Sequence, residues 1–103
     1  MKERDHERVS IAQSVVLDCS SGKREVRVSD LSTGGCYVDC ISALQPDEIV
    51  KLRFILPHDR SEEIPGTIVY VHPGIGFGIQ FNDMTAQQRM VLEQLIFLNG
   101  GKP

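Results

Sequence analysis

Apolar and polar residues alternate with a period of two along most of this chain, which predicts a domain built mainly from β-strands. The pattern is clearest over residues 49–56, where Val50 and Leu52 alternate with Lys51 and Arg53. The segments that share it are residues 9–19, 25–29, 36–41, 49–56, 64–72 and 76–81. Six short strands at near-regular spacing predict a six-stranded antiparallel, split β-barrel, whose first two strands pair as a hairpin.

Turn signals separate these segments along the chain. Residues 20–23 and 45–48 contain serine, glycine, proline and acidic residues, and the charged stretch 57–63 is predicted to be a loop. Pro65 and Gly66 interrupt the start of the fifth segment, which indicates an edge strand or a bulge at that point.

The period changes after Phe81, where the pattern predicts a single C-terminal helix. Thr85 and Gln88 have the spacing of a capping box, in which two residues exchange side-chain and backbone hydrogen bonds at a helix start. Apolar residues then recur at helical spacing until Asn99 and two glycines end the helix. A helix of about 14 residues with one apolar stripe is expected to pack on a mouth or flank of the barrel.

The composition is that of an ordinary globular domain. The 103 residues suit one domain, and 41% hydrophobic with 24% charged residues argue against wholesale disorder. A net charge of −3 argues against a DNA-binding, RNA-binding or membrane-surface protein, because these usually carry a basic excess. No apolar run approaches the roughly 18 residues that cross a bilayer, and the charged start lacks the apolar core of a secretory signal.

The cysteines and histidines predict neither disulfides nor a metal site. The cysteines are odd in number, three, and form no C-x-x-C pair. If Cys36 and Cys40 lie on one strand, they are roughly 13 Å apart, too far for a disulfide. We therefore expect reduced, partly buried thiols and a cytoplasmic protein. His58 and His72 have no ligand partners at a useful spacing.

Two short motifs carry the candidate chemistry. Arg4 and Arg8 form R-x-x-x-R, and Asp30, Ser32 and Gly35 form D-x-S-x-x-G in a turn at a strand end. A guanidinium matches a phosphate, or the O6/N7 edge of guanine, with two parallel hydrogen bonds that lysine cannot reproduce. Each motif alone has a plainer explanation, as an exposed charge cluster or as a turn whose side chains bond their own backbone. Together they suit a ligand that carries both phosphate and a purine edge.

With both motifs in this order on a pattern of six strands and a helix, the chain resembles a PilZ domain, the bacterial receptor module for cyclic di-GMP. Residues 76–81 are similar to the glycine–aromatic last strand that is usual in the family. The resemblance spans nearly the whole chain. It implies a flexible N-terminal arm over residues 1–8, a barrel with its helix over residues 9–99 and a tail over residues 100–103.

The resemblance also implies a role for each motif residue. Arg4 and Arg8 would contact the phosphates and the Hoogsteen edges of guanine as the arm wraps over the ligand. Asp30 would accept hydrogen bonds from a guanine N–H edge, and Ser32 would hydrogen-bond the ligand. Gly35 would let the backbone approach where a side chain would clash.

Other features bear on the same expected site. Gly34 belongs to the turn, and Tyr70 or His72 on the fifth segment can supply a ring that contacts the ligand, where the family often has tryptophan. Glu3 stands where family members often have a further arginine, which leaves open whether one nucleotide or a stacked pair binds. The expected ligand is cyclic di-GMP itself, with no cofactor.

The sequence leaves a second class of function open. Asp5 and Glu7 lie inside the arginine motif and bring the charge of residues 1–8 to zero, which favours a PilZ-like adaptor that binds proteins and no nucleotide. An enzyme is the third alternative, disfavoured because no nucleophile has an evident base and no carboxylate pair has a recognisable spacing. The downstream protein partner, and whether the chain is a monomer or a homodimer, stay open.

Overall fold

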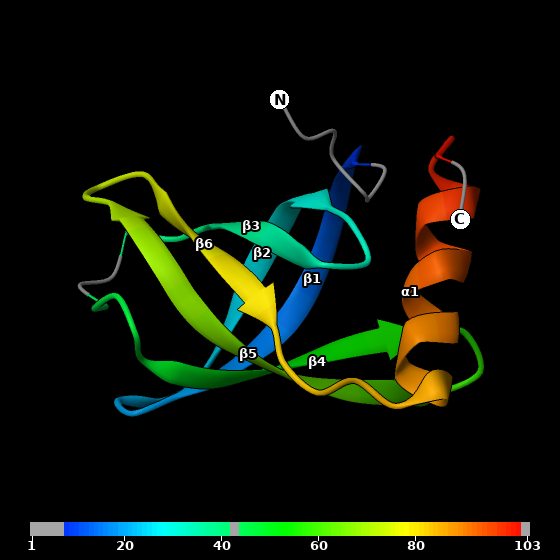
Figure 1. Ribbon diagram of the computed structural model, residues 1–103, viewed down its shortest axis with the longest axis horizontal. Coiled ribbons are helices and arrows are strands. Elements are labelled where there is room, and N and C mark those ends of the chain that lie inside the picture. The colour runs from blue at the N-terminus through cyan, green and yellow to red at the C-terminus, as the bar shows by residue number, and fades with distance from the viewer. Residues whose placement is uncertain (1–7, 42–43, 102–103) are drawn as a thin grey trace.

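Six antiparallel strands close into a barrel, and one helix packs beside it (Figure 1). The computed structural model describes residues 8–41 and 44–101. The elements are β1 (Val9–Cys19), β2 (Gly22–Leu31), β3 (Gly35–Asp39), β4 (Ile49–Leu56), β5 (Arg60–His72), β6 (Gly76–Phe81) and α1 (Ala86–Leu98). The strands follow one another around the barrel in the order β1-β2-β3-β6-β5-β4. The predicted six-stranded antiparallel barrel with a C-terminal helix is confirmed, including the β1–β2 hairpin.

The alternation seen in the sequence sends one set of apolar side chains into the barrel. Because successive side chains of a strand point to opposite faces, each strand contributes every second residue to the interior. Phe54 and Phe81 meet edge to face with ring centroids 6.5 Å apart, a favourable arrangement for aromatic rings. Fully buried members of this core include Leu17, Val28, Val38, Leu52, Phe54, Ile68 and Phe77.

Strand β5 begins earlier than the sequence pattern predicts. The expected loop over residues 57–63 was wrong, because Arg60 already pairs with Leu56 of β4, and the pairing continues along the hairpin. The connection is reduced to three residues, in which His58 and Asp59 adopt left-handed φ values of 65° and 59°. The charged side chains at the start of β5 are largely exposed, so they carry no apolar alternation that marks a strand.

Pro65 lies where β5 is paired on one side only, because its pairing with β6 begins at the next residue, Gly66, and this agrees with the edge expected at this point. It pairs with Lys51 of β4, while its carbonyl oxygen accepts a hydrogen bond from Asn82 N at 2.9 Å. The residue is tolerated because the side that lacks an N–H faces the region where β6 has already ended at Phe81. The irregularity in this strand lies further on, between Ile68 and Tyr70.

Strands β2 and β3 also differ from the predicted ranges. Strand β2 runs longer at both ends, and at its start Gly22, with φ 117°, pairs with Cys19 across the two-residue turn 20–21. Strand β3 begins one residue early, at Gly35, and ends at Asp39 rather than at residue 41. Ile41 is 83% exposed, which shows that the apolar alternation does not continue past the strand end.

The helix begins and ends as the sequence predicts. Thr85 Oγ1 accepts from Gln88 N at 3.1 Å, and Thr85 N donates to Gln88 Oε1 at 2.8 Å, which completes the capping box. Gly100, with φ 93°, takes the left-handed position after the C-cap Asn99. Within the described part of the chain no helix combines the length and apolar character that spanning a bilayer requires.

The C-terminal end of α1 packs against the start of β1. Gly101 is buried, and a Cβ built on it would overlap side-chain atoms of Val9 and Ile96. The other end of the helix is fixed to β5, since Gln88 Nε2 donates to the Glu63 carbonyl oxygen at 2.8 Å. These contacts place the end of the helix next to the residue that follows Arg8.

Candidate ligand-binding groove

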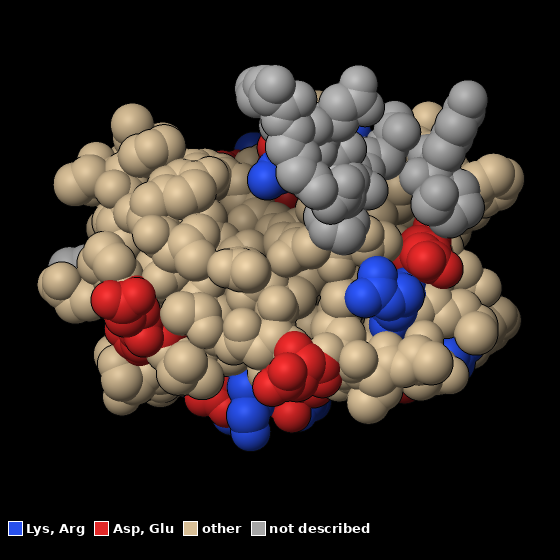
Figure 2. Space-filling view, viewed as in Figure 1, with Lys and Arg blue, Asp and Glu red and all other residues tan. Residues whose placement is uncertain are grey.

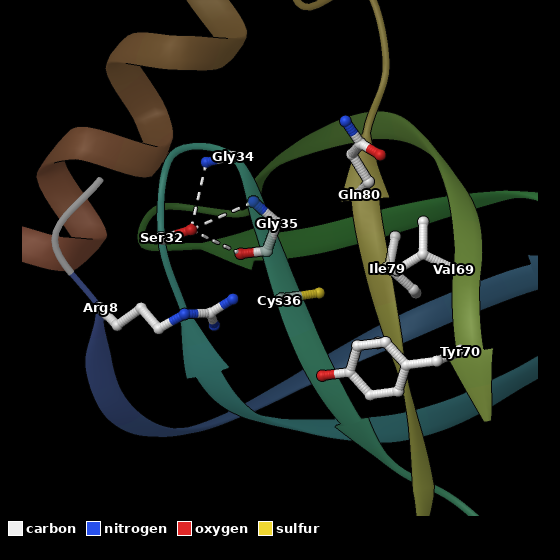
Figure 3. A pocket seen from close by; sticks show the side chains of 10 residues that line it. Arg8, Ser32, Gly34, Gly35, Cys36, Val69, Tyr70, Ile79 and Gln80 are labelled. Carbon is white, nitrogen blue, oxygen red and sulfur yellow. Dashed lines mark hydrogen bonds between the residues drawn. The ribbon is translucent and has the colours of Figure 1, made fainter. Parts of the chain in front are cut away.

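Two adjoining hollows form one groove on the outer face of the barrel, across the end of β2 and strands β3, β6 and β5. Their volumes are about 350 Å³ and 600 Å³, and both are lined by Arg8 and Tyr70. We call this surface the outer groove. Its first hollow, shown in Figure 3, is lined by Arg8, Ser32, Gly34, Gly35, Cys36, Val69, Tyr70, Gly78, Ile79 and Gln80, and its second by Arg8, Ser10, Ser29, Asp30, Tyr37 and Tyr70.

An ion pair lies in the second hollow of the outer groove. Arg8 Nη1 donates to Asp30 Oδ1 at 3.0 Å, and the two side chains are 41% and 39% exposed. The β1–β2 register brings them together, because Ser10 pairs with Asp30 and Val9 with Leu31. A guanidinium carries five N–H donors, so one bond to Asp30 leaves it capacity to bind an anion as well.

Ser32 is buried and shapes the turn that joins β2 to β3. Its Oγ accepts hydrogen bonds from Gly34 N and Gly35 N, both at 3.2 Å, and contacts the Gly35 carbonyl oxygen at 3.3 Å. Its own N–H donates to that carbonyl at 2.9 Å. Only 3% of Ser32 is exposed, and its buried hydroxyl makes these hydrogen bonds within the turn (Figure 3).

Gly35 is required by the neighbouring strand. It opens β3 opposite Gln80 of β6, and a Cβ built on it would overlap the carbonyl oxygen of Ile79. A side chain at this position would therefore push β3 and β6 apart, whatever lies in the outer groove. The absence of a side chain also leaves the Gly35 backbone on the wall of the first hollow.

Three rings lie side by side beyond the ion pair. We call Tyr37, Tyr70 and His72 the aromatic floor. Ring centroids are 6.2 Å apart for Tyr37 and Tyr70, 5.1 Å for Tyr70 and His72, and 5.8 Å for Tyr37 and His72, with tilts of 32–41°. Tyr37 Oη lies 3.0 Å from His72 Nδ1, at hydrogen-bond distance. The rings come from β3 and β5, which flank β6.

Two ionisable groups near the groove stay neutral at ordinary pH. Burial raises the pKa of the Cys36 thiol far above its usual value, and the nearby Asp30 carboxylate adds to the shift. The pKa of Tyr37 is also raised, chiefly by desolvation and then by Tyr70 and Asp39. Cys36 therefore offers no thiolate for nucleophilic chemistry, and the Tyr37 hydroxyl keeps its proton.

Charged side chains are sparse on this face of the molecule. In the space-filling view, most of the visible surface over β5 and β6 belongs to uncharged residues (Figure 2). Any attraction for an anion is therefore local to Arg8 among the described residues that line the outer groove.

Most residues singled out from the sequence lie together on this surface. Arg8, Asp30, Ser32, Gly34, Gly35 and Tyr70 all line the outer groove. His72 lies next to Tyr70 in the aromatic floor. Arg4 and the rest of the predicted arm, residues 1–7, lie outside the described residues, as do residues 102–103 of the predicted tail.

Tyr37 and Gly78 are two residues of the groove that the sequence motifs do not predict. Tyr37 pairs with Gly78 of β6, and Gly78 in turn pairs with Tyr70 of β5. The available signal was the position of Tyr37 on the outward side of its strand, between the buried residues Cys36 and Val38. A large ring on an outward position is informative when the neighbouring strand offers glycine, but that pairing is not readable from one sequence.

Comparison with known proteins identifies the family. The PilZ domain model matches residues 2–98, so the chain belongs to the PilZ family. PilZ domains are receptor and adaptor domains, generally without catalytic activity, and many members bind cyclic di-GMP. A comparison with curated proteins finds no match.

Solved structures share the fold at low sequence identity. The PilZ domain of Escherichia coli YcgR with c-di-GMP superposes with a TM-score of 0.77 at 15% identity, over 95% of this chain and 92% of that one. The PilZ domain of CeSA from a cellulose-synthesizing bacterium gives 0.67 at 23% identity, over 87% and 94%. The Bacillus subtilis inhibitor of motility MotI/DgrA gives 0.75 at 15% identity, over 92% of this chain and 50% of that chain, so this chain spans about half of that protein. At these identities the likeness establishes the fold.

Proposed function

We propose that this PilZ domain is a bacterial, cytoplasmic receptor for cyclic di-GMP that binds the nucleotide in the outer groove. The observation that carries the proposal is the Arg8–Asp30 pair, which places a cation and a carboxylate 3.0 Å apart beside the Asp30–Gly35 turn. A guanine nucleotide needs both groups, because a cation offsets the charge of its phosphates and an ionised acceptor takes hydrogen bonds from its N–H edge. The family match over residues 2–98 supports the same ligand.

Each residue of the site has a role in this proposal. Arg8, together with Arg4 from the arm, binds phosphate oxygens and the Hoogsteen edge of guanine, and Asp30 accepts from the guanine N–H edge. Ser32 and Gly35 keep the turn in shape and present its backbone to the ligand. Gly34 belongs to the same wall, and Tyr70 and His72 contact the base.

The signal follows from closing the N-terminal arm, residues 1–8, over the bound nucleotide. Closing the arm changes the surface that a protein partner contacts. Ordering a segment on binding costs conformational entropy, which lowers the affinity for the ligand and enlarges the conformational change. The domain acts without catalysis and without a cofactor in this proposal. Its protein partner and its state as monomer or homodimer are left open.

Calorimetry of the purified chain with cyclic di-GMP tests the proposal. We expect saturable heat for the wild type, and a loss of affinity of about five- to 150-fold for Arg8→Ala if a bidentate contact is removed. Arg53→Ala is the matched control, because Arg53 is an exposed arginine of β4 outside the outer groove. Absence of heat at high micromolar nucleotide would exclude the receptor function, and equal affinities for Arg8→Ala and the wild type would exclude Arg8 from the site.

An adaptor that binds only proteins is the second candidate. It is favoured by the ion pair itself, since Asp30 already partners Arg8, and by the acidic residues Asp5 and Glu7 in the arm. Partner capture from a lysate of the source cells separates the two candidates. A receptor's partner responds to added cyclic di-GMP, whereas an adaptor's partner is indifferent to it.

A further inference from the structure

The aromatic floor lies on the glycines of β6. A Cβ built on Gly78 would overlap the Cε2, Cζ and Oη atoms of Tyr70, and one built on Gly76 would meet the ring of Tyr37. Gly76 and Gly78 are buried although they point to the outer face of the barrel, because the rings cover them. The side chains that alternate with these glycines, such as Phe77, fill the interior.

Gly78 differs from Gly35 and Gly76 in the atoms that an added Cβ would meet. At Gly35 an added Cβ would overlap the carbonyl oxygen of Ile79, and at Gly76 that of Val38. A side chain at either position would therefore prevent the close pairing of β3 and β6. At Gly78 the three nearest atoms all belong to the far end of the Tyr70 side chain. The missing side chain at Gly78 therefore determines where the Tyr70 ring lies, and the pairing of the strands does not depend on it.

We propose that Gly78 is a positioning residue of the nucleotide site, which lets the Tyr70 ring lie flat across β6 beside Tyr37 and His72, so that the three rings together take one face of a purine base. The inference rests on the proposed function and adds to it a third ring, Tyr37, and the glycine beneath the floor. In Figure 3 the Tyr70 ring extends across β6 with its hydroxyl towards β3, and the Arg8 side chain enters from the opposite side of the same space.

The place of the floor suits a base that also carries phosphate. Tyr37 and Tyr70 line the hollow that holds Arg8 and Asp30, so a base on the rings has its edge near a carboxylate and its phosphates near a cation. Stacking on an aromatic surface accepts any flat base, and the polar groups at its edge then select among bases. The contact between Tyr37 Oη and His72 Nδ1 fixes the third ring relative to the other two.

The chain has a built-in reporter for this surface. It contains no tryptophan and two tyrosines, Tyr37 and Tyr70, both of which belong to the floor. Intrinsic tyrosine fluorescence therefore reports on the floor alone. We expect cyclic di-GMP to quench this fluorescence in the wild type along the same saturation curve that calorimetry gives.

Gly78→Ala is the decisive variant. Alanine suits a strand better than glycine, and only a ring tip has to move, so the urea midpoint of unfolding is expected to stay at or above that of the wild type. Its affinity for cyclic di-GMP is expected to fall about fivefold or more, with reduced quenching at saturation, because the displaced ring no longer completes the floor. Gly74→Asn is the matched glycine control, since Gly74 has open space around it and a φ of 77° that asparagine tolerates.

A double variant separates positioning from a direct clash with the ligand. Tyr70→Ala alone is expected to weaken binding, and Gly78→Ala added to it is expected to change affinity no further, because the ring that the new Cβ displaces is gone. If the double variant binds more weakly than Tyr70→Ala, the new methyl group meets the nucleotide itself and the positioning role is overturned. Wild-type affinity of a folded Gly78→Ala chain overturns it as well.

The remaining outcomes also decide the matter. Should Gly78→Ala fail to fold, Tyr37→Leu tests the same floor, and an affinity within twofold of the wild type overturns the inference. A wild type that binds no cyclic di-GMP overturns both the receptor function and the floor. A wild type that binds it, with calorimetric heat but without tyrosine quenching, overturns the floor alone.

Discussion

Arg8 Nη1 and Asp30 Oδ1 lie 3.0 Å apart, which joins the residue before β1 to the second-last residue of β2. The protein itself thus holds the guanidinium at the outer groove. A cation placed in advance loses less side-chain freedom when an anion arrives, and this favours affinity. The same contact means that an anion has to share Arg8 with Asp30, so binding depends on the geometry of the pair.

Replacing Asp30 by alanine is expected to affect binding far more than stability. Both side chains of the pair are about two-fifths exposed, and exposed ion pairs contribute about 1 kcal/mol or less to the free energy of unfolding. Losing a charged hydrogen-bond acceptor for guanine costs about 1.5–3 kcal/mol, or roughly ten- to 150-fold in affinity. Calorimetry and urea unfolding of one preparation measure the two effects.

Asp39→Ala is the control for that experiment. Asp39 has almost the same exposure, 38%, and pairs with Arg27 at 3.4 Å, but it does not line the outer groove. It is expected to change the free energy of unfolding by a similarly small amount and affinity much less than Asp30→Ala. Equal losses of affinity for the two variants would show that Asp30 acts only through net charge.

Ser32→Ala is expected to destabilise the domain. The buried Ser32 hydroxyl accepts from the backbone amides of Gly34 and Gly35, and removing it leaves both without that partner. Buried amides without a partner cost about 1–3 kcal/mol, which urea unfolding detects as a lower midpoint at constant slope. Ser14→Ala, at an exposed position of β1, serves as the control. A Ser32→Ala chain as stable as the wild type would remove the structural role of the hydroxyl.

Gly35→Ala is expected to be among the most damaging substitutions in the barrel. The new methyl group would overlap the Ile79 carbonyl oxygen, and a backbone atom in a paired strand cannot move aside. Overpacking of this kind costs about 1–3 kcal/mol or more of the free energy of unfolding. Gly78→Ala, which meets only a ring tip, is the direct comparison. Equal unfolding midpoints for the two variants would contradict the distinction between backbone and ring contacts.

Acid is expected to weaken the fold partly through Glu48. Its Oε2 accepts from Ser20 Oγ at 2.7 Å and from Ser20 N at 2.9 Å, and these bonds, the hydroxyl first, hold the pKa of Glu48 below its usual value. A lowered pKa in the folded chain contributes stability that is present above the usual glutamate value, about 4.5, and is lost as the pH falls through the lowered one.

The variant Glu48→Gln isolates that contribution. Urea unfolding is measured from about pH 6 to about pH 3, a range that spans the titration of a carboxylate. The free energy of unfolding of Glu48→Gln should fall less steeply over this range than that of the wild type. Ser20→Ala should show part of this flattening, because it removes the hydroxyl and keeps the backbone N–H that also donates to Glu48. Parallel acid limbs for all three chains would mean that the Ser20 contact has no effect on the titration of Glu48.

The regular parts of the fold were predictable because each is encoded locally. Strand β4 has the predicted bounds, since alternate positions such as Val50 and Leu52 face the core. The helix start was equally clear, because Thr85 and Gln88 exchange their hydrogen bonds within four residues of chain. Local signals of this kind need no knowledge of the neighbouring strands.

The remaining features depend on pairing between distant segments. Residues 60–63 form a strand only because they meet 53–56 of β4, and their own charged sequence favours a loop. The aromatic floor joins β3 to β5 across β6, over separations of more than thirty residues between Tyr37 and His72. Of the candidate site, the two motifs were visible in the sequence, and the ring surface beside them needed the barrel register.

The burial of Gly101 against Val9 connects the two ends of the described chain. Val9 follows Arg8 directly, and Gly101 N donates to the carbonyl oxygen of Ile96 in α1 at 2.9 Å, so Val9 and Gly101 link Arg8 to the last turn of the helix. A change at Arg8 is therefore connected to the C-terminal end of α1 through Val9 and Gly101. Under the proposed receptor function, a protein bound at the end of that helix would lie within a few residues of the cyclic di-GMP site without contacting the nucleotide.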